Sequence, residues 1–414
     1  MTSTAPSSST DAVSEWLRGA ARPIHGTGPA GTGSDLRPLT DRLATARVVG
    51  LGESTRFSRQ TYGVRDRILR TLVTEHGFRA LALQDSARSG ARMDAYVRTG
   101  AGDPVGALAE AWRPLRTAET AATLEWIRHY NVAHPGDQVE VFGVQPPAAG
   151  PADYDAVLTY AAARAPDRLA ELESQLTPIR TAHRIDEHIQ RHRGIHPGRP
   201  FAEDARNALA LVESLPADGD AAADHTAALD HARLIVAFHE NSVAGRGGFG
   251  GDDGGSAQTL IDRYDTTGAR IVYWDGIGHT AGTELRTGGA TLMRGEGSRL
   301  RAHFGADYVS VAIGFHHGDL GTAVAPEPEP DLVDAALGEV DLPAFYLDLR
   351  APAPAPVRAW RAAPAHLRVI SGMYDPAKDR EARLTVDSLA DAFDILVHIR
   401  ETAPVDWLPE ITAG

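Results

Sequence analysis

Residues 48–56 constrain this chain more than any other stretch, because an apolar run stops at a glycine turn and charged side chains follow at once. The run 48–52 is followed directly by Glu53 and then by Arg56. A continuous apolar run is typical of a buried parallel strand. In an open α/β sheet, ligands bind beyond the carboxyl ends of the strands. The stretch therefore predicts a strand that delivers Glu53 and Arg56 to a functional edge.

Three further apolar runs end in the same way, each with a polar residue. They are residues 79–85, 139–145 and 270–276, with the polar residues Gln84, Gln145 and Asp275 at their ends. Parallel strands place their carboxyl ends at one edge of the sheet. These side chains and Glu53 are therefore expected to border one polar pocket.

Strand-like runs alternate with segments of helical period on both sides of a long, purely helical stretch. This pattern predicts an α/β fold, with a mostly parallel sheet flanked by helices and an inserted all-helical subdomain. Between the insertion and the resumed alternation, seven of eleven residues are glycine, which is typical of a mobile lid or linker. The predicted parts are a flexible N-terminal tail (1–35), the first part of the core (36–150), the helical insertion (151–244), the Gly-rich loop (245–255) and the second part of the core (256–414).

Composition narrows the range of partners. The 414-residue chain carries a net charge of −14, which argues against nucleic acid or an anionic membrane as the main partner. It contains no cysteine, so disulfides, thiolate metal sites and a cysteine nucleophile are excluded. Residues 1–11 lack the basic start and apolar core of a signal peptide, and no apolar run reaches the ~20 residues of a membrane span. We expect a cytoplasmic protein with a small-molecule substrate. The sequence does not define its oligomeric state.

The motifs of the chain resemble those of the erythromycin esterase family in order and spacing, over roughly residues 38–405. The matching segments are Gly50–Glu53, His76–Arg79, Trp126–Asn131, Phe142–Gly143, Ile271–Trp274 with His279, and Phe393–Asp394 with Glu401–Thr402. The resemblance implies an α/β core, a helical subdomain and a cleft between them. It also implies hydrolysis of a macrolide lactone without a metal, through water activated by histidine and glutamate.

The chain departs from the family pattern at chemically important positions. Where the family's first motif has a histidine, this chain has Arg56, and Gln84 stands where a glutamate is usual. Gly276 replaces the first histidine after the fourth strand, and Gln145 replaces an aspartate after the third. A guanidinium does not act as a general base at physiological pH. Macrolide hydrolysis by the family route is therefore not expected.

The matched groups that remain suit proton transfer. Glu53 and His279 are predicted to be the catalytic acid/base pair, since both exchange protons near neutral pH. Arg56 and Arg65 could bind an anion or stabilise a developing enolate. The predicted ligand contacts are completed by Gln84, Gln145, Asp275 and His316.

Structural explanations compete with several of these roles. Glu53 and Arg56 are three residues apart and could form a structural ion pair, and Arg65 could pair with Glu53 for stability alone. His188 and His192 have the spacing of a metal-binding helix, but no flanking glutamate completes a His-Glu-x-x-His motif. No Gly-x-Ser-x-Gly elbow and no complete dinucleotide fingerprint is present.

The sequence therefore predicts a tailoring enzyme of natural-product biosynthesis, without metal or cofactor. Its chemistry would be an isomerisation, elimination, dehydration or cyclisation at a carbonyl-containing molecule. One alternative is an ester or lactone hydrolase with a modified mechanism. The other is a non-catalytic homologue that binds a metabolite.

Overall fold

The computed structural model describes residues 9–28, 33–196, 198–216, 222–248, 254–287 and 291–409. Within them, nine strands form one mixed sheet with a parallel centre. Along the sheet the order is β1 (Arg22–Pro23), β10 (Ala344–Asp348), β13 (Ile395–Thr402), β8 (Tyr308–Asp319), β2 (Val48–Glu53), β5 (Ile271–Gly276), β3 (Ala80–Ser86) and β4 (Glu140–Gln145), with β9 (Val324–Ala325) beside β8. The predicted fold class is confirmed.

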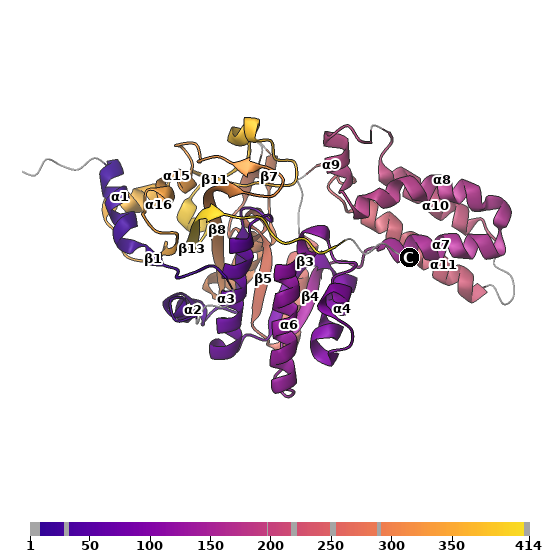
Figure 1. The fold of residues 1–414 in the computed structure, drawn as a ribbon, viewed down its shortest axis with the longest axis horizontal. Coiled ribbons are helices and arrows are strands. Elements are labelled where there is room, and N and C mark those ends of the chain that lie inside the picture. The colour runs from indigo at the N-terminus through magenta and orange to yellow at the C-terminus, as the bar shows by residue number, and fades with distance from the viewer. Residues whose placement is uncertain are drawn as a thin grey trace, which may run out of the picture.

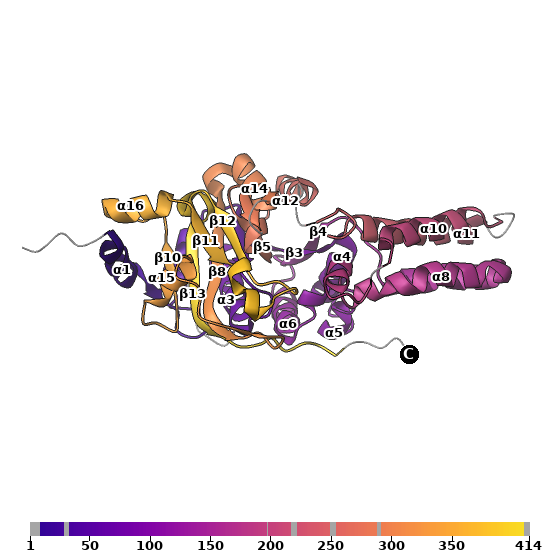
Figure 2. The ribbon, with the colours of Figure 1, turned by 90° about the horizontal axis from the view of Figure 1, so that it is seen from above.

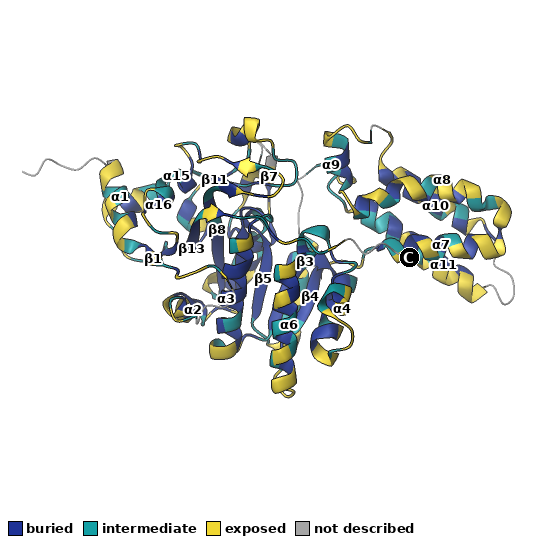
Figure 3. Ribbon diagram, viewed as in Figure 1, coloured by how far each residue is buried: buried dark blue, intermediate teal, exposed yellow. Residues whose placement is uncertain are grey.

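Helices cover both faces of this sheet, and Figure 2 shows α3 and α6 on one side and α12 and α14 on the other. The helices of the α/β body are α2 (Arg37–Leu43), α3 (Arg59–His76), α4 (Ala87–Thr99), α5 (Pro104–Ala107), α6 (Ala118–Ala133), α12 (Gly254–Thr267), α13 (Ile277–Thr280), α14 (Glu296–Phe304), α15 (Val333–Gly338), α16 (Ala355–Ala362) and α17 (Leu389–Ala392). The central strands are buried throughout (Figure 3), as expected for parallel strands covered on two faces.

The structure contains a second, smaller sheet that was not predicted from the sequence. It is antiparallel, and its strands are β11 (Ala365–Arg368), β12 (Arg383–Val386), β6 (Leu285–Thr287) and β7 (Thr291–Met293). Strands of three or four residues give too short a pattern to be separated from loops by periodicity.

Within the predicted N-terminal tail, residues 9–28 contact the α/β body. Helix α1 (Ser9–Ala20) packs beside α16, where the guanidinium of Arg361 lies 4.3 Å from the ring centre of Trp16. Strand β1 then pairs with β10. Leu17 and Ile24 are almost fully buried. Burial of these apolar side chains stabilises the contact of this N-terminal segment with the α/β body.

Residues 151–240 form a bundle of helices that projects from the α/β body (Figure 1). Its members are α7 (Pro151–Arg164), α8 (Leu169–Ile179), α9 (Glu187–His192), α10 (Phe201–Glu213) and α11 (Ala222–Glu240). The bundle has its own apolar core, which includes Tyr154, Leu176 and Phe201. The carboxylate of Asp153 joins the bundle to the body through Arg88 of α4, at 2.6 Å. Residues 249–253 of the expected glycine-rich loop lie outside the described residues.

Tyr154 in the core of this bundle contacts two histidines, the buried His239 and the partly buried His183. The hydroxyl of Tyr154 lies 2.8 Å from Nε2 of His239 and 3.3 Å from Nε2 of His183. Burial lowers the pKa of His183 to about 4 and that of His239 to about 3. Both imidazoles are therefore neutral in the folded protein at neutral pH.

Acidification is expected to destabilise the bundle for this reason. In the unfolded chain, these imidazoles take up protons below about pH 6.5, whereas in the fold they do so only near their lowered pKa values. The unfolded state thus binds more protons across that window, and the free energy of unfolding falls as the pH drops below about 6.5. The slope is up to about 1.4 kcal/mol per pH unit for each histidine.

Urea unfolding followed by far-UV circular dichroism at several pH values measures this slope. His239→Gln, which cannot titrate, should reduce it, while His129→Gln on the exposed side of α6 serves as the control. An unchanged slope in His239→Gln would show that the buried imidazole is not the source.

Candidate active site

The ends of β2, β5 and β3 bring the predicted polar residues together. Glu53 ends β2, Asp275 lies one residue before the end of β5, and Gln84 lies near the end of β3. The order β2-β5-β3 makes these strands direct neighbours. Gly52 permits this crowding, because a Cβ there would lie 2.0 Å from Oγ1 of Thr280. The structure therefore places three distant segments at one carboxyl edge.

Glu53 is held in a buried ion pair. Its carboxylate accepts a hydrogen bond from Arg65, which also donates to the backbone oxygens of Leu51 and Asp275. Both side chains are only 3% exposed. Burial lowers the pKa of Arg65 to about 9. Because its guanidinium is buried and bound by protein oxygens, the geometry favours a structural role for Arg65 beside Glu53, and its predicted role in anion binding stays a prediction.

Arg56 lies on the solvent side of this pair and is also surrounded by protein groups. Its guanidinium donates to Oε1 of Gln84 at 2.5 Å, and it lies 3.4 Å from Glu53 and 3.6 Å from Asp275. The indole ring of Trp112 covers it at 4.5 Å. Burial lowers the pKa of Arg56, and the charge of Asp275 opposes that shift. Arg56 is nevertheless 23% exposed, so one side of it is open to a ligand.

The segment before α9 of the helical bundle also lies near Arg56. Asp186, the residue before α9, receives a side-chain hydrogen bond from Trp112. Burial raises the pKa of Asp186, and the charges of His188 and Arg56 oppose this shift. Arg116 of the α/β body donates a hydrogen bond to the backbone oxygen of His183 in the bundle, at 3.1 Å, and so holds this segment near the body. The bundle therefore contributes groups to the surroundings of Arg56.

His279 has a carboxylate partner that the sequence did not reveal. Nδ1 of His279, in α13, lies 3.1 Å from Oε2 of Glu296, the first residue of α14. His279 is 24% exposed, whereas Glu296 is 4% exposed. A buried carboxylate beside Nδ1 favours the tautomer in which Nδ1 carries the proton and Nε2 carries the lone pair. This pair is the best-formed acid/base arrangement at the edge.

Two glycines bring Glu296 to this position. A Cβ on Gly295 would lie 2.9 Å from Cα of His279, and one on Gly297 would lie 2.4 Å from the backbone oxygen of Thr280. Both glycines therefore allow the start of α14 to pack directly on the backbone around His279. In the sequence, only the Gly-Glu-Gly at the start of this helix could have indicated the role of Glu296. An acidic residue in the first turn of a helix is common, so this pattern is not specific.

Gly297→Ala is expected to lower activity by at least about tenfold, because the added methyl group pushes Glu296 away from His279. The stability of the variant should also fall, since the clash is with backbone. Gly136→Ala is the control, as nothing lies within 4 Å of a Cβ at that position. Full activity in Gly297→Ala would mean that the position of Glu296 is unimportant.

Arg56 lies near both Glu53 and His279. A Cβ on Gly276 would lie 3.4 Å from Nη2 of Arg56 and 3.5 Å from Cδ2 of His279, so Arg56 and His279 flank this glycine. The guanidinium of Arg56 also lies 3.4 Å from Glu53. That Glu53 and His279 form an acid/base pair stays a prediction.

The remaining predicted residues lie on the flanking strands β4 and β8. Gln145 is exposed at the end of β4. His316 lies on β8 with Nδ1 2.9 Å from Nδ1 of His317, and its ring packs near His398 and Gly338. Binding roles for Gln145 and His316 stay predictions.

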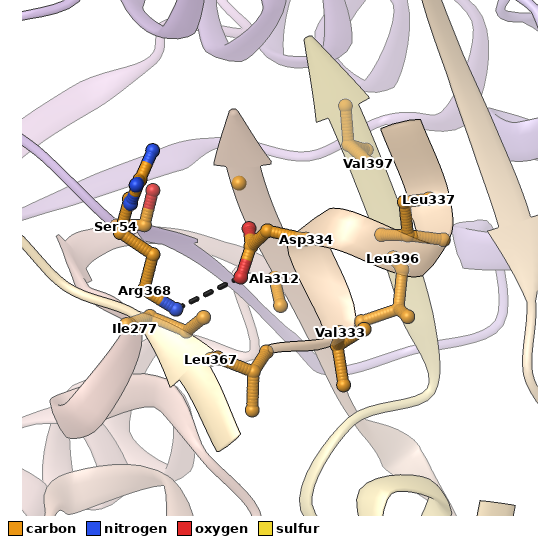
Figure 4. Close-up of a pocket in the computed structure, with 11 residues that line it drawn as sticks. Ser54, Ile277, Ala312, Val333, Asp334, Leu337, Leu367, Arg368, Leu396 and Val397 are labelled. Carbon is orange, nitrogen blue, oxygen red and sulfur yellow. Dashed lines mark hydrogen bonds between the residues drawn. The ribbon is translucent and has the colours of Figure 1, made fainter. Parts of the chain in front are cut away.

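A small cavity lies behind Ser54, on the α15 side of the sheet (Figure 4). Its volume is about 10 Å³, which is room for about one water molecule. Asp334 accepts from the backbone N–H of Arg368 at 2.8 Å there, and burial raises the pKa of Asp334 to about 6. A cavity of this size is too small for an organic substrate.

Solved structures with the same architecture define the class of the fold. A protein from Bacillus cereus is 21% identical, with a TM-score of 0.64 over 98% of this chain and all of its own. A protein described as a succinoglycan biosynthesis protein is also 21% identical, with a TM-score of 0.65 over 98% of this chain and 100% of its own. A mutant of the erythromycin esterase EreC in its open conformation gives a TM-score of 0.55 at 16% identity, over 91% of this chain and 96% of its own.

The sequence comparison identifies the family. A sequence model of the erythromycin esterase family matches residues 73–402, so the chain belongs to this family of esterases. The erythromycin esterase type II of Escherichia coli is 26% identical over 138 residues. That match covers 33% of this chain and 32% of the relative's length. In the described residues, we find no helix with the length and apolar character needed to cross a membrane.

The structure offers a physical reason for two departures from the family pattern. Arg56 and Gly276 each stand where the resemblance implies a histidine. Because Gly276 has no side chain, the long side chain of Arg56 extends to within 3.4 Å of the position of its missing Cβ. A Cβ at position 276 would already be in van der Waals contact with this guanidinium. The two replaced positions therefore share one space at the edge of the sheet.

Proposed function

We propose that this protein hydrolyses a carboxylic ester or lactone of a small molecule, with His279 as the general base. The pairing of His279 with the buried carboxylate of Glu296, at 3.1 Å, carries this proposal. Membership of an esterase family supports hydrolysis over the non-hydrolytic chemistry that we expected from the sequence. The altered residues around Arg56 argue for a substrate other than a macrolide.

The steps follow from the positions of the side chains. Glu296 accepts a hydrogen bond from the Nδ1–H of His279 and stabilises the imidazolium that forms when Nε2 takes a proton from water as the water oxygen attacks the ester carbonyl. The exposed side of Arg56 is placed to stabilise the negative charge that develops on the carbonyl oxygen. The imidazolium then returns its proton to the departing alcohol oxygen, and the products are an acid and an alcohol. Glu53 and Arg65 hold Arg56 and the strand ends in place.

A panel of nitrophenyl esters, simple lactones and one macrolide tests the proposal, with release of acid as the measured quantity. We expect turnover of at least one class of small ester or lactone above the buffer background. A ligand that raises the melting temperature without forming any product would instead indicate a metabolite-binding protein, and would contradict the proposal.

Proton transfer without hydrolysis is the second candidate, as in a tailoring enzyme of natural-product biosynthesis. The observation that favours it is the permanent cation of Arg56 beside His279, an arrangement suited to an enolate. Exchange of a substrate C–H with deuterated solvent, in the absence of acid release, would favour this candidate over the hydrolase.

A further inference from the structure

Three potential metal ligands converge at the edge of the sheet from two segments of the chain. Asp275 and His279 are four residues apart, across the junction of β5 and α13, and Glu296 begins α14. One ligand atom from each lies within 4.8 Å of the others. Asp275 and Glu296 are almost fully buried, while His279 is open enough for an ion to enter.

Neighbouring groups hold these ligands in position. The hydroxyl of Tyr273 and the backbone N–H of Gly276 both donate to the carboxylate of Asp275, the latter at 2.6 Å. The glycines at 295 and 297 fix the backbone that carries Glu296. Such outer contacts orient the ligands in protein metal sites and raise metal affinity.

The charge and type of the donors select the ion. Two carboxylates and one neutral imidazole carry two negative charges, which match a divalent cation. A nitrogen donor beside two carboxylates suits zinc or a neighbouring transition metal better than magnesium or calcium, which prefer oxygen alone. We propose that Asp275, His279 and Glu296 bind a divalent transition-metal ion, which takes the place of the proton between His279 and Glu296.

Arg56 is a neighbour that opposes metal binding, and this gives a second, opposite prediction. Nη2 of Arg56 lies 3.6 Å from Oδ1 of Asp275, so its positive charge repels an incoming cation. Neutralising Arg56 should therefore strengthen metal binding, while removal of a ligand weakens it. A structural effect of mutation would not produce these opposite changes.

Zinc binding to the protein, first treated with a chelator and then dialysed, tests the proposal by isothermal titration and by metal analysis after gel filtration. The wild type should retain a single zinc ion. Glu296→Gln and His279→Asn should each weaken binding by at least about tenfold, and Arg56→Gln should tighten it. The melting temperature of each metal-free variant establishes that it is folded.

His192→Ala is the matched control, because His188 and His192 on α9 offer the competing zinc site. This variant should bind zinc as the wild type does. The proposal is overturned if His192→Ala abolishes binding, if Glu296→Gln binds as tightly as the wild type, or if the wild type binds no zinc. None of these measurements requires a substrate. A metal that replaces the Nδ1 proton leaves the remaining proton of His279 on Nε2, so the proposed hydrolysis belongs to the metal-free protein, and bound zinc is expected to inhibit it.

Discussion

Replacement of His279 by alanine is expected to lower kcat/KM for ester hydrolysis by at least about 10²-fold. The reason is that His279 is the exposed member of a pair whose other member, Glu296, is buried 3.1 Å away. Without the imidazole, the residues around Arg56 can still bind a carbonyl compound, but the base that is paired with Glu296 is gone. Initial rates over a range of substrate concentrations separate the loss of kcat from any change in KM.

Glu296→Gln provides the companion measurement. An amide in place of the carboxylate still occupies the space but can no longer stabilise an imidazolium, so we expect a loss of about 10–100-fold, mainly in kcat. If His279→Ala hydrolyses esters at the wild-type rate, or if Glu296→Gln loses much more than His279→Ala, the assigned roles are wrong.

The largest effect on stability is expected for Arg65→Met. This change removes the cation from Glu53 while leaving the carboxylate buried, and it also removes the donor to the backbone oxygens of Leu51 and Asp275. An uncompensated buried charge of this kind costs about 3–5 kcal/mol of unfolding free energy. Urea unfolding at neutral pH measures the change.

The double variant Glu53→Leu/Arg65→Met separates structural from catalytic roles. A buried ion pair replaced as a whole by apolar residues often costs little, so much of the lost stability should return. If Glu53 acts only through structure, a stable double variant should keep measurable hydrolysis. A folded double variant with no activity would instead support the catalytic role that the sequence predicts for Glu53.

The central sheet could be predicted from the sequence because its strands carry a strong pattern. The apolar runs before Glu53, Gln84 and Asp275 became β2, β3 and β5, and the rule for carboxyl ends brought these residues to one edge. The family resemblance is confirmed by the match over residues 73–402. Long buried strands and strand–helix alternation are patterns of neighbouring residues, so they can be recognised in a single sequence.

The partners of the site residues could not be predicted in this way. Glu296 reaches His279 through two glycine contacts between backbones, and Trp112 reaches Arg56 from a loop held by Asp85 at 2.9 Å. Such contacts depend on how loops pack in three dimensions, about which periodicity and composition carry no information. The sequence also left open whether Arg65 interacts with Glu53 or with a ligand, and its burial beside Glu53 favours the structural role.

The central claim is that a water molecule activated by His279 enters the product. Hydrolysis of a turned-over ester in water enriched in ¹⁸O, followed by mass spectrometry of both products, tests this directly. The account predicts a single labelled oxygen in the carboxylic acid and none in the alcohol, with the rate of labelling strongly reduced in His279→Ala. An unlabelled product of rearrangement or elimination, or labelling at the same rate in the variant, would contradict it.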